Sequence, residues 1–254
     1  MRLAQIRKKE KVGERFVLLE VEEESIATRA KPGQFVMVRP FEGVYDPILP
    51  RPFAILRTEG NCFTLLFEIV GRGTFLLSHL EPGDNLRVLG PLGRGFSLET
   101  PRAVLIGGGR GIVPLVFLAI EFTKRGIPFA FFAGFREKGE LSLLRVLEGI
   151  TDISWSCEEK VAGGFCGTVL GLFEKHLDVV CQSNTRIYAC GPEGMLRGLA
   201  KALQGKEEVT EVSLEARMGC GFGVCLGCVV PRKNGGYWHV CSDGPVFRLS
   251  EVVL

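Results

Sequence analysis

Hydrophobic residues in the first 98 positions fall into short runs that Gly and Pro separate. The runs are rich in Val, Leu, Ile and Phe, which favour strands, and they cover 15–22, 34–40, 51–59, 62–70 and 85–93. Short runs at this spacing, with turn residues between them, predict an antiparallel β-barrel or sandwich. The stretch Gly-Pro-Leu-Gly-Arg-Gly at 90–95 then predicts a linker.

The pattern changes after this linker. Two nearly continuous apolar runs, 103–109 and 128–135, predict buried strands, and the segment between them, 111–126, predicts a helix that ends in glycine. The alternation of helix and strand continues through 141–150, 152–159, 168–177, 185–190 and 192–203. Such alternation is typical of a parallel α/β sheet with helical crossovers. We therefore expect a β-domain over residues 1–98 and an α/β domain over residues 99–208.

The remaining segment, 209–254, returns to short β-type runs around four cysteines. These follow a C-x4-C-x2-C-x12-C spacing, with glycines on both sides of the first, at Cys220, Cys225, Cys228 and Cys241. This is the plant-type spacing of [2Fe–2S] ligands, and glycine lets backbone N–H groups approach the negatively charged sulfides. The segment is too short to build a core of its own, so we expect the cluster to tether it.

A structural zinc site is the alternative for the same four cysteines. Zinc ribbons usually carry two C-x2–4-C pairs, whereas this segment has one, between Cys225 and Cys228. The spacing therefore favours the iron–sulfur cluster.

Composition restricts the function classes. The chain has 254 residues, 31 basic and 29 acidic, so its charge does not favour a nucleic-acid partner. The N-terminus lacks the apolar core of a signal peptide, and no apolar run reaches the length of a membrane span, so we expect a cytosolic protein without a membrane partner. In a reducing compartment we interpret the unspaced Cys62, Cys157, Cys166 and Cys181 as small core residues.

A glycine-rich turn follows the first buried strand of the α/β domain. Its glycines, Gly107, Gly108, Gly109 and Gly111, lie between that strand and the start of a helix. Such a turn lets a pyrophosphate approach the backbone, and the helix N-terminus supplies N–H groups. A tight turn that merely needs small residues is the alternative.

A second turn supports the dinucleotide interpretation. Cys190, Gly191 and Pro192 end a later strand and precede a helix, so both turns are expected at the carboxyl edge of the sheet. The two turns can then hold opposite ends of one dinucleotide, with the Cys190 thiol beside the nicotinamide. Glu158 and Glu159 end an intervening strand, and their carboxylates would accept ribose hydroxyls but repel a 2′-phosphate, which favours NAD over NADP.

Two motifs in the β-domain can bind a flavin nucleotide. Arg51 precedes Pro52 at the start of a strand, where a guanidinium is suited to phosphate, although a surface turn would equally explain the pair. Downstream, Gly73 and Thr74 form a compact turn whose N–H groups and hydroxyl suit a pyrophosphate.

Taken in order along the chain, these motifs resemble the ferredoxin–NADP reductase superfamily. The tail, with Glu215-Ala216-Arg217-Met218-Gly219-Cys220-Gly221 and the later Val-Cys-Ser-Asp-Gly-Pro-Val-Phe at 240–247, is similar to the electron-transfer subunits of NAD-dependent class 1B dihydroorotate dehydrogenase. The resemblance implies an FAD-binding antiparallel barrel, an NAD(H)-binding α/β domain and a [2Fe–2S] module. It also implies three flavin segments, comprising Arg51, Pro52, Phe53 and Ala54, then Leu66, Phe67 and Glu68, then Gly73 and Thr74. Ala54 replaces a usual Ser or Thr, and Glu68 replaces a frequent basic residue.

The resemblance further implies an obligatory FMN-containing catalytic partner, with two copies of each chain in the complex. A flavin can link hydride chemistry on NAD to single-electron transfer through a cluster. The three modules leave no room for the partner's (β/α)8 barrel of roughly 250 residues. The alternatives are a flavin and iron–sulfur subunit of a ferredoxin:NADP+ transhydrogenase, a sulfite reductase or a hydrogenase, and a non-enzymatic zinc-binding module.

Overall fold

The N-terminal half of the chain forms a closed six-stranded antiparallel barrel. The computed structural model describes residues 1–40, 46–180 and 182–254. The barrel strands run in the order β1-β2-β5-β4-β3-β6 and comprise β1 (Arg2–Val12), β2 (Phe16–Glu22), β3 (Phe35–Arg39), β4 (Arg51–Glu59), β5 (Cys62–Glu68) and β6 (Asn85–Leu92). Two short helices, α1 (Glu24–Ala27) and α2 (Arg72–Ser78), connect them. The predicted barrel is thus confirmed.

Two local features of the barrel differ from the sequence prediction. The first strand, β1, has no apolar run, because only alternate side chains such as Ala4 and Ile6 enter the barrel, while charged residues face outward. The predicted linker at 90–95 is partly wrong, since β6 continues through Gly90, Pro91 and Leu92. Gly90 is required there because a Cβ would lie 2.6 Å from Val36 Cγ1 on the neighbouring strand.

The second half contains a seven-stranded sheet in the order β10-β9-β8-β7-β11-β12-β15. All its neighbouring pairs are parallel except β12 with β15. The strands are β7 (Arg102–Gly108), β8 (Phe129–Phe135), β9 (Ile153–Cys157), β10 (Phe165–Cys166), β11 (Thr185–Cys190), β12 (Thr210–Ser213) and β15 (Val246–Arg248). The connecting α-helices are α3 (Ile112–Arg125), α4 (Val169–Glu174), α5 (Leu177–Val180) and α6 (Glu193–Ala202). The predicted parallel α/β sheet is confirmed.

In the described part of this half, three 3-10 helices complete the elements: η1 (Gly109–Gly111), η2 (Lys138–Leu147) and η3 (Glu207–Val209). The segment 141–150, expected within the helix–strand alternation, is largely η2 rather than an α-helix. Its hydrogen bonds connect residues three apart, as from Glu140 N–H to Glu137 O. Gly139 and Ser142, which favour turns, lie within it.

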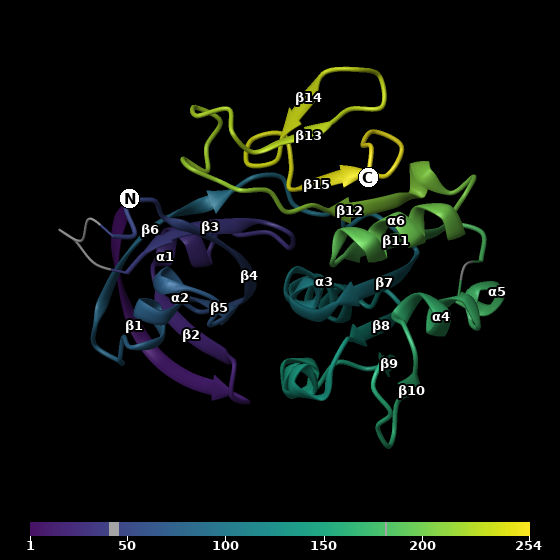
Figure 1. Cartoon of the computed structure of the whole chain (residues 1–254), viewed down its shortest axis with the longest axis horizontal. Helices are drawn as coiled ribbons and strands as arrows, with labels where there is room; N and C mark the ends of the chain where they lie inside the picture. The colour runs from purple at the N-terminus through teal and green to yellow at the C-terminus, as the bar shows by residue number, and fades with distance from the viewer. Residues whose placement is uncertain (41–45, 181) are drawn as a thin grey trace.

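Helix α3 joins the two halves. It lies between the barrel and the sheet in Figure 1 and packs against β4. One side contributes Leu118 and Phe122 to the core beneath the sheet, while Phe117 belongs to the barrel core. A mostly apolar helix is expected where both sides are covered.

The C-terminal segment is anchored to the sheet at both ends. After β12 the chain leaves the sheet, passes the cysteines and the hairpin β13 (Val229–Pro231) and β14 (Tyr237–His239), and returns as β15 beside β12. Figure 1 shows the hairpin above both the barrel and the sheet. The cysteine loop contacts the barrel so closely that a Cβ on Gly221 would lie 2.3 Å from Met37 Cγ. Two strands of this segment, β12 and β15, thus belong to the same sheet as β7 to β11.

No helix in the described residues has both the length and the hydropathy to cross a bilayer.

The connection between barrel and sheet is held by a buried tyrosine. The Tyr188 hydroxyl donates to Ser97 O at 2.9 Å, and the Ser97 N–H donates to Glu211 at 2.9 Å. We expect Tyr188→Phe to lower the free energy of unfolding by about 1 kcal/mol, because the Ser97 carbonyl loses its partner. Chemical denaturation measures this, and Tyr237→Phe, at an exposed site, is the control. An unchanged midpoint for Tyr188→Phe would show that the bond does not hold the connection.

Candidate functional site

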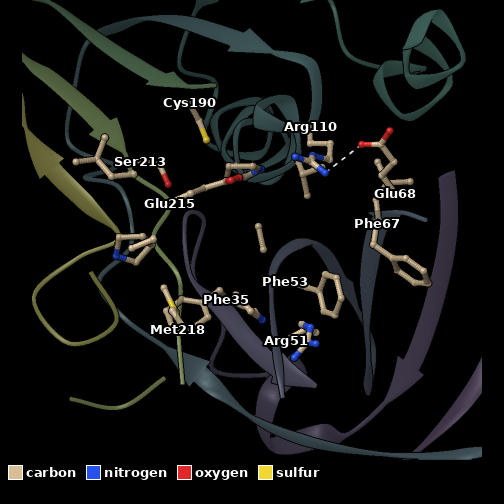
Figure 2. Close-up of a pocket in the computed structure, with 18 of the residues that line it drawn as sticks. Phe35, Arg51, Phe53, Phe67, Glu68, Arg110, Cys190, Ser213, Glu215 and Met218 are labelled. Carbon is tan, nitrogen blue, oxygen red and sulfur yellow. Dashed lines mark hydrogen bonds and ion pairs between the residues drawn. The ribbon is translucent and has the colours of Figure 1, made fainter. Parts of the chain in front are cut away.

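A cavity of about 290 Å³ lies where the barrel, the α/β sheet and the C-terminal segment meet. Figure 2 shows Arg51 and Phe53 on its barrel side, with the Phe67 ring directed back into the barrel core, and Cys190 and Ser213 on its sheet side. The lining includes every predicted residue of the first two flavin segments: Arg51, Pro52, Phe53, Ala54, Leu66, Phe67 and Glu68. We call this space the inter-domain cavity.

The third predicted flavin segment lies beside the first. A Cβ on Gly73 would lie 3.2 Å from Arg51 Nε, so the guanidinium lies against the N-terminus of α2. Thr74 is buried, lines the same cavity and accepts hydrogen bonds from the Val70 and Gly71 N–H groups at 3.0 and 3.1 Å. A guanidinium beside a glycine turn suits a phosphate group. Apolar rings cover the neighbouring wall, where Phe53 and Phe67 are 5.4 Å apart between centroids.

The opposite wall carries a small polar group of three residues. Cys190 is buried and lies opposite Ser213 on the adjacent strand, with Glu215 nearby. Burial, assisted by the negative charge of Glu215, raises the pKa of the Cys190 thiol to about 12. The thiol is therefore neutral near pH 7 and can donate or accept a weak hydrogen bond, but it is not a nucleophilic thiolate.

A second cavity, of about 500 Å³, adjoins the first at the carboxyl edge of the sheet. Both predicted glycine turns line it through Gly108, Gly109 and Gly111 on one side and Gly191 and Pro192 on the other. We call this space the edge cavity. Its position at the ends of β7 and β11 is the usual position of a dinucleotide in an open α/β sheet.

Glycine is needed in the two turns for a different physical reason at each position. A Cβ on Gly111 would lie 2.2 Å from Cys190 O and 2.6 Å from Gly191 N, so the turns touch backbone to backbone. Gly109 has φ +51°, a left-handed conformation that favours glycine. Gly107 instead makes room for Ile112 in the first turn of α3. The turns thus need glycine for their mutual packing as well as for a ligand.

An ion-pair network separates the two cavities. Arg110 Nη1 lies 3.0 Å from Glu68 Oε2, and both residues line both cavities. Arg15 Nε lies 2.9 Å from Glu68 Oε1, and Arg15 also pairs with Glu137. The network therefore links the barrel strand β5 to the glycine turn and to the segment after β8.

The four cysteines are arranged as two pairs. The Cys220 thiol interacts most strongly with that of Cys225, and the Cys241 thiol with that of Cys228, while a weaker charge interaction links Cys241 to Cys220. Among the residues that the structure describes, no group of three or more His, Cys, Asp or Glu side chains is placed to hold a single metal ion. Two pairs of thiolates, one for each iron, is the arrangement that a binuclear cluster needs.

Backbone N–H groups surround these sulfurs. Gly223 N–H donates to Cys241 Sγ at 3.1 Å, and the Phe222 and Cys225 N–H groups donate to Cys220 Sγ at 3.4 Å. The loop points its N–H groups inward because three of its residues have left-handed φ values, namely Gly221 (+83°), Gly223 (+88°) and Leu226 (+56°). The donors and sulfurs present therefore fit a negatively charged [2Fe–2S] group.

The N–H groups also change the acidity of the thiols. Burial acts to raise the pKa of Cys220, but the N–H groups of Cys225 and Phe222 outweigh it and lower the pKa to about 6. Burial and the adjacent Cys228 raise the pKa of Cys241 to about 12. Binding of iron to all four sulfurs must therefore release protons.

Several functional side chains were not anticipated from the sequence. Arg110, Ser213 and Glu140 line the cavities together with the predicted residues, whereas Glu158 and Glu159 follow β9, two strands away from β7. Glu159 accepts the Lys138 N–H at 2.9 Å. Arg110 lies within the predicted glycine turn, so its position in the sequence could have indicated that it lines the cavity.

The unspaced cysteines are only partly core residues. Cys157 is buried as predicted, but Cys62 is partly exposed and Cys166 is exposed, so the prediction was wrong for these two. Cys166 lies on the two-residue edge strand β10, where one face remains open to solvent. Cys181 lies outside the described residues.

Comparisons with known proteins agree with this geometry. Residues 215–253 match the family model of the iron–sulfur cluster binding domain of dihydroorotate dehydrogenase B. The chain is 38% identical to the dihydroorotate dehydrogenase B (NAD+) electron transfer subunit of Bacillus caldolyticus, over 96% of this chain and 95% of the relative. The corresponding subunit of Desulforamulus reducens is also 38% identical, over 92% and 91%.

Solved structures share the fold. An NADH-dependent reduced ferredoxin–NADP oxidoreductase, studied for electron bifurcation, superposes with a TM-score of 0.85 at 28% identity, covering 100% of this chain and 90% of the other. A ferredoxin–NADP+ reductase of Neisseria gonorrhoeae, solved with FAD and NADP, superposes with a TM-score of 0.64 at 15% identity, over 80% of this chain and 90% of that one.

The contact between the two glycine turns gives a first prediction for this site. Gly111→Ala should destabilise the protein by about 1–3 kcal/mol, because the new methyl group must displace the backbone at Cys190 and Gly191. Thermal unfolding measures the effect. Gly194→Ala is the matched control, since a Cβ there meets nothing within 4 Å and should be neutral or stabilise by about 0.5 kcal/mol. Equal stability of Gly111→Ala and the wild type would contradict the close contact.

The acidity of Cys190 gives a second prediction. With a pKa of about 12, only about one thiol in 10⁴ is ionised at pH 8, so iodoacetamide should leave Cys190 unmodified between pH 7 and 9. The fraction of thiolate, and with it the rate, should rise only as the pH approaches 12 in protein that remains folded. Peptide mass spectrometry follows each cysteine, with exposed Cys166 as the internal control. Comparable labelling of Cys190 and Cys166 at pH 8 would refute the assignment.

Proposed function

The chain belongs to the electron-transfer subunits of dihydroorotate dehydrogenase B, and on that basis we propose that it passes electrons from the FMN of a catalytic partner, through a [2Fe–2S] cluster and FAD, to NAD+. Cys220, Cys225, Cys228 and Cys241 hold the cluster, and the inter-domain cavity holds the flavin. FAD, when bound, supplies the chemistry that joins hydride transfer to single-electron transfer. The reaction serves de novo pyrimidine synthesis.

One observation carries this proposal. The inter-domain cavity is lined by Met218 and Ala216, and the chain reaches the first cluster cysteine, Cys220, two residues after Met218. On its other side the same cavity adjoins the two glycine turns. A flavin in this cavity therefore lies between the dinucleotide and the cluster, as a two-electron to one-electron relay requires.

The side chains of the cavity have separable roles in this proposal. Arg51 and the turn before α2 bind the FAD phosphates, while the Phe53 and Phe67 rings exclude water from one wall. The neutral Cys190 thiol, opposite Ser213, lies where a nicotinamide approaches through the edge cavity and limits how that ring can be placed.

NAD(H) rather than NADP(H) is the proposed dinucleotide. Of the described residues that line the edge cavity, four carry carboxylates, namely Glu68, Glu140, Glu193 and Glu215, and one carries a guanidinium. An additional 2′-phosphate, with its two negative charges, is poorly accommodated near so many carboxylates. Glu158 and Glu159, which were assigned this role from the sequence, remain proposed contributors from the end of β9, two strands away from β7.

The cysteine loop is the proposed docking surface for the FMN subunit. Phe222, Val224 and Leu226 are 53%, 71% and 61% exposed around the cluster ligands. Exposed apolar side chains that lie together mark a protein interface, and an interface here places the partner close to the cluster. We propose a complex of two copies of each chain in the cytoplasm.

A second candidate function has one specific observation in its favour. The similarity to the ferredoxin–NADP oxidoreductase covers all of this chain at a TM-score of 0.85. A reductase subunit of such a system would use the same two cavities and the same cluster. Its partner would be a different flavoprotein, so identification of the partner separates the two functions.

The proposal predicts the composition and activity of the purified complex. Prepared anaerobically, the chain should contain one FAD, two irons and two acid-labile sulfides, and it should oxidise NADH with a dye acceptor but not dihydroorotate. Added FMN-containing dihydroorotate dehydrogenase subunit should produce NAD+-dependent orotate formation. Zinc without sulfide, or dihydroorotate oxidation by the isolated chain, would overturn the proposal.

The variant Cys225→Ser tests the electron route. It should lose the cluster and at least about 90% of electron transfer to the partner, while dye reduction from NADH through FAD is retained better, because the dye accepts directly from FAD. Iron analysis and the two assays on one preparation measure this. Equal loss of both activities in a variant that keeps FAD would show that the cluster is not the route to the partner.

A further inference from the structure

The edge cavity has an unusual charge for a site that takes a dinucleotide. Among the described residues that line it, Arg110 is the one basic side chain, and four glutamate side chains line the same cavity. The diphosphate of a dinucleotide carries two negative charges. Without a basic side chain, the N–H groups of the turns would have to hold these charges close to the carboxylates. A guanidinium in the same cavity offsets this repulsion and strengthens binding of the diphosphate.

Arg110 is placed where the two cavities meet. It lines both of them, and Figure 2 shows its guanidinium directed toward Glu68 across from Cys190 and Glu215. The Arg110 side chain is 48% exposed, whereas that of Glu68 is 11% exposed. The anion is therefore the fixed, buried member of the pair, and the cation is the accessible one.

The contacts of the pair leave Arg110 with capacity for a ligand. Only Nη1 bonds Glu68, so the remaining N–H donors of the guanidinium are directed elsewhere. Glu68 is meanwhile shared with Arg15, whose Nε bonds the other carboxylate oxygen at 2.9 Å. Arg15 offsets part of the negative charge that would otherwise be paired with Arg110 alone.

We propose that Arg110 binds the diphosphate of NAD(H) and that Glu68, supported by Arg15, is the residue that positions it. This inference rests on the proposed dinucleotide site and assigns its anion recognition to a side chain rather than to the glycine backbone alone. Glu68 holds the guanidinium over the edge cavity, beside the N–H groups at the start of α3. The ion pair therefore orients the Arg110 guanidinium, and the guanidinium contacts the diphosphate of NAD(H).

Variants of Arg110 and Glu68 distinguish a role of the guanidinium in binding from a role of the ion pair in holding the domains together. If the guanidinium binds the diphosphate, Arg110→Ala should weaken ADP-ribose binding about tenfold, measured by calorimetry on the FAD- and cluster-loaded protein. Glu68→Gln keeps a side-chain oxygen that can accept the Arg110 Nη1–H bond and so still positions the guanidinium, but it removes a negative charge; it should bind ADP-ribose at least as tightly as the wild type. If the pair merely ties the domains together, both variants should weaken binding alike, and that result would overturn the proposal.

Kinetics supply a second readout. Arg110→Ala should raise KM for NADH about tenfold with kcat changed less than about twofold. Dihydronicotinamide riboside has no phosphate, so the KM of the Arg110→Ala variant for this substrate should remain within about twofold of the wild-type value. Arg145→Ala is the matched control, because Arg145 forms an exposed inter-domain pair with Glu10 at 2.9 Å outside both cavities. An equal increase in KM for both substrates would exclude diphosphate recognition.

Loss of FAD from a variant, or failure of the proposed function itself, would each give a distinct result. Should Glu68→Gln lose FAD, Arg110→Lys replaces it, and this variant should recover most of the ADP-ribose affinity that Arg110→Ala loses; no recovery would contradict the proposal. Failure of the proposed function looks different, because wild-type protein would then bind neither ADP-ribose nor NADH. If the wild type binds ADP-ribose and Arg110→Ala binds it with the same affinity, only the assignment of Arg110 is refuted.

Discussion

The pairing of β12 with β15 is the constraint on which the site depends. Three residue pairs, Glu211 with Arg248, Val212 with Phe247 and Ser213 with Val246, close residues 214–245 into a loop whose two ends are fixed at the sheet edge. Leu214 N–H extends this contact by donating to Pro245 O at 2.9 Å. Leu214 and Pro245 both line the inter-domain cavity, so the cysteine loop and the cavity share the same anchor. The cysteine segment is thus placed by sheet hydrogen bonds and packing as well as by the group it binds, which adds to the tether expected from the sequence.

The barrel and the sheet are held together by two unlike kinds of contact. Helix α3 supplies apolar packing, with Phe117 in the barrel core and Phe122 in the sheet core. Polar contacts surround it, since Tyr188 and Glu211 bind the connection at Ser97, and Arg15, Glu68 and Arg110 link the barrel to the glycine turn. Apolar burial provides most of the free energy, and the polar contacts fix the orientation in which the two halves face each other. This orientation sets the size of both cavities.

Local patterns in the sequence predicted much of this site, and long-range contacts decided the rest. The cysteine spacing and the two glycine turns are short segments whose chemistry depends on their own backbone, so they could be recognised without a structure. Strand β1 could not be recognised, because its outward charges dominate the pattern. The partnership of Arg110 with Glu68 joins residues 42 apart in sequence, and nothing in either segment indicates the other. The proximity of Ser213 to Cys190 likewise depends on the order of β11 and β12 in the sheet.

The exposed side chains of the cysteine loop also have a consequence for the chain before it meets a partner. Phe222, Val224 and Leu226 present apolar surface on a loop whose N–H groups bond the cysteine sulfurs, so turning these side chains inward would break those bonds. Apolar surface of this kind promotes self-association and recognition by chaperones and proteases. A subunit made in excess would thus be removed or would aggregate, and the supply of the two chains would need to be balanced in synthesis.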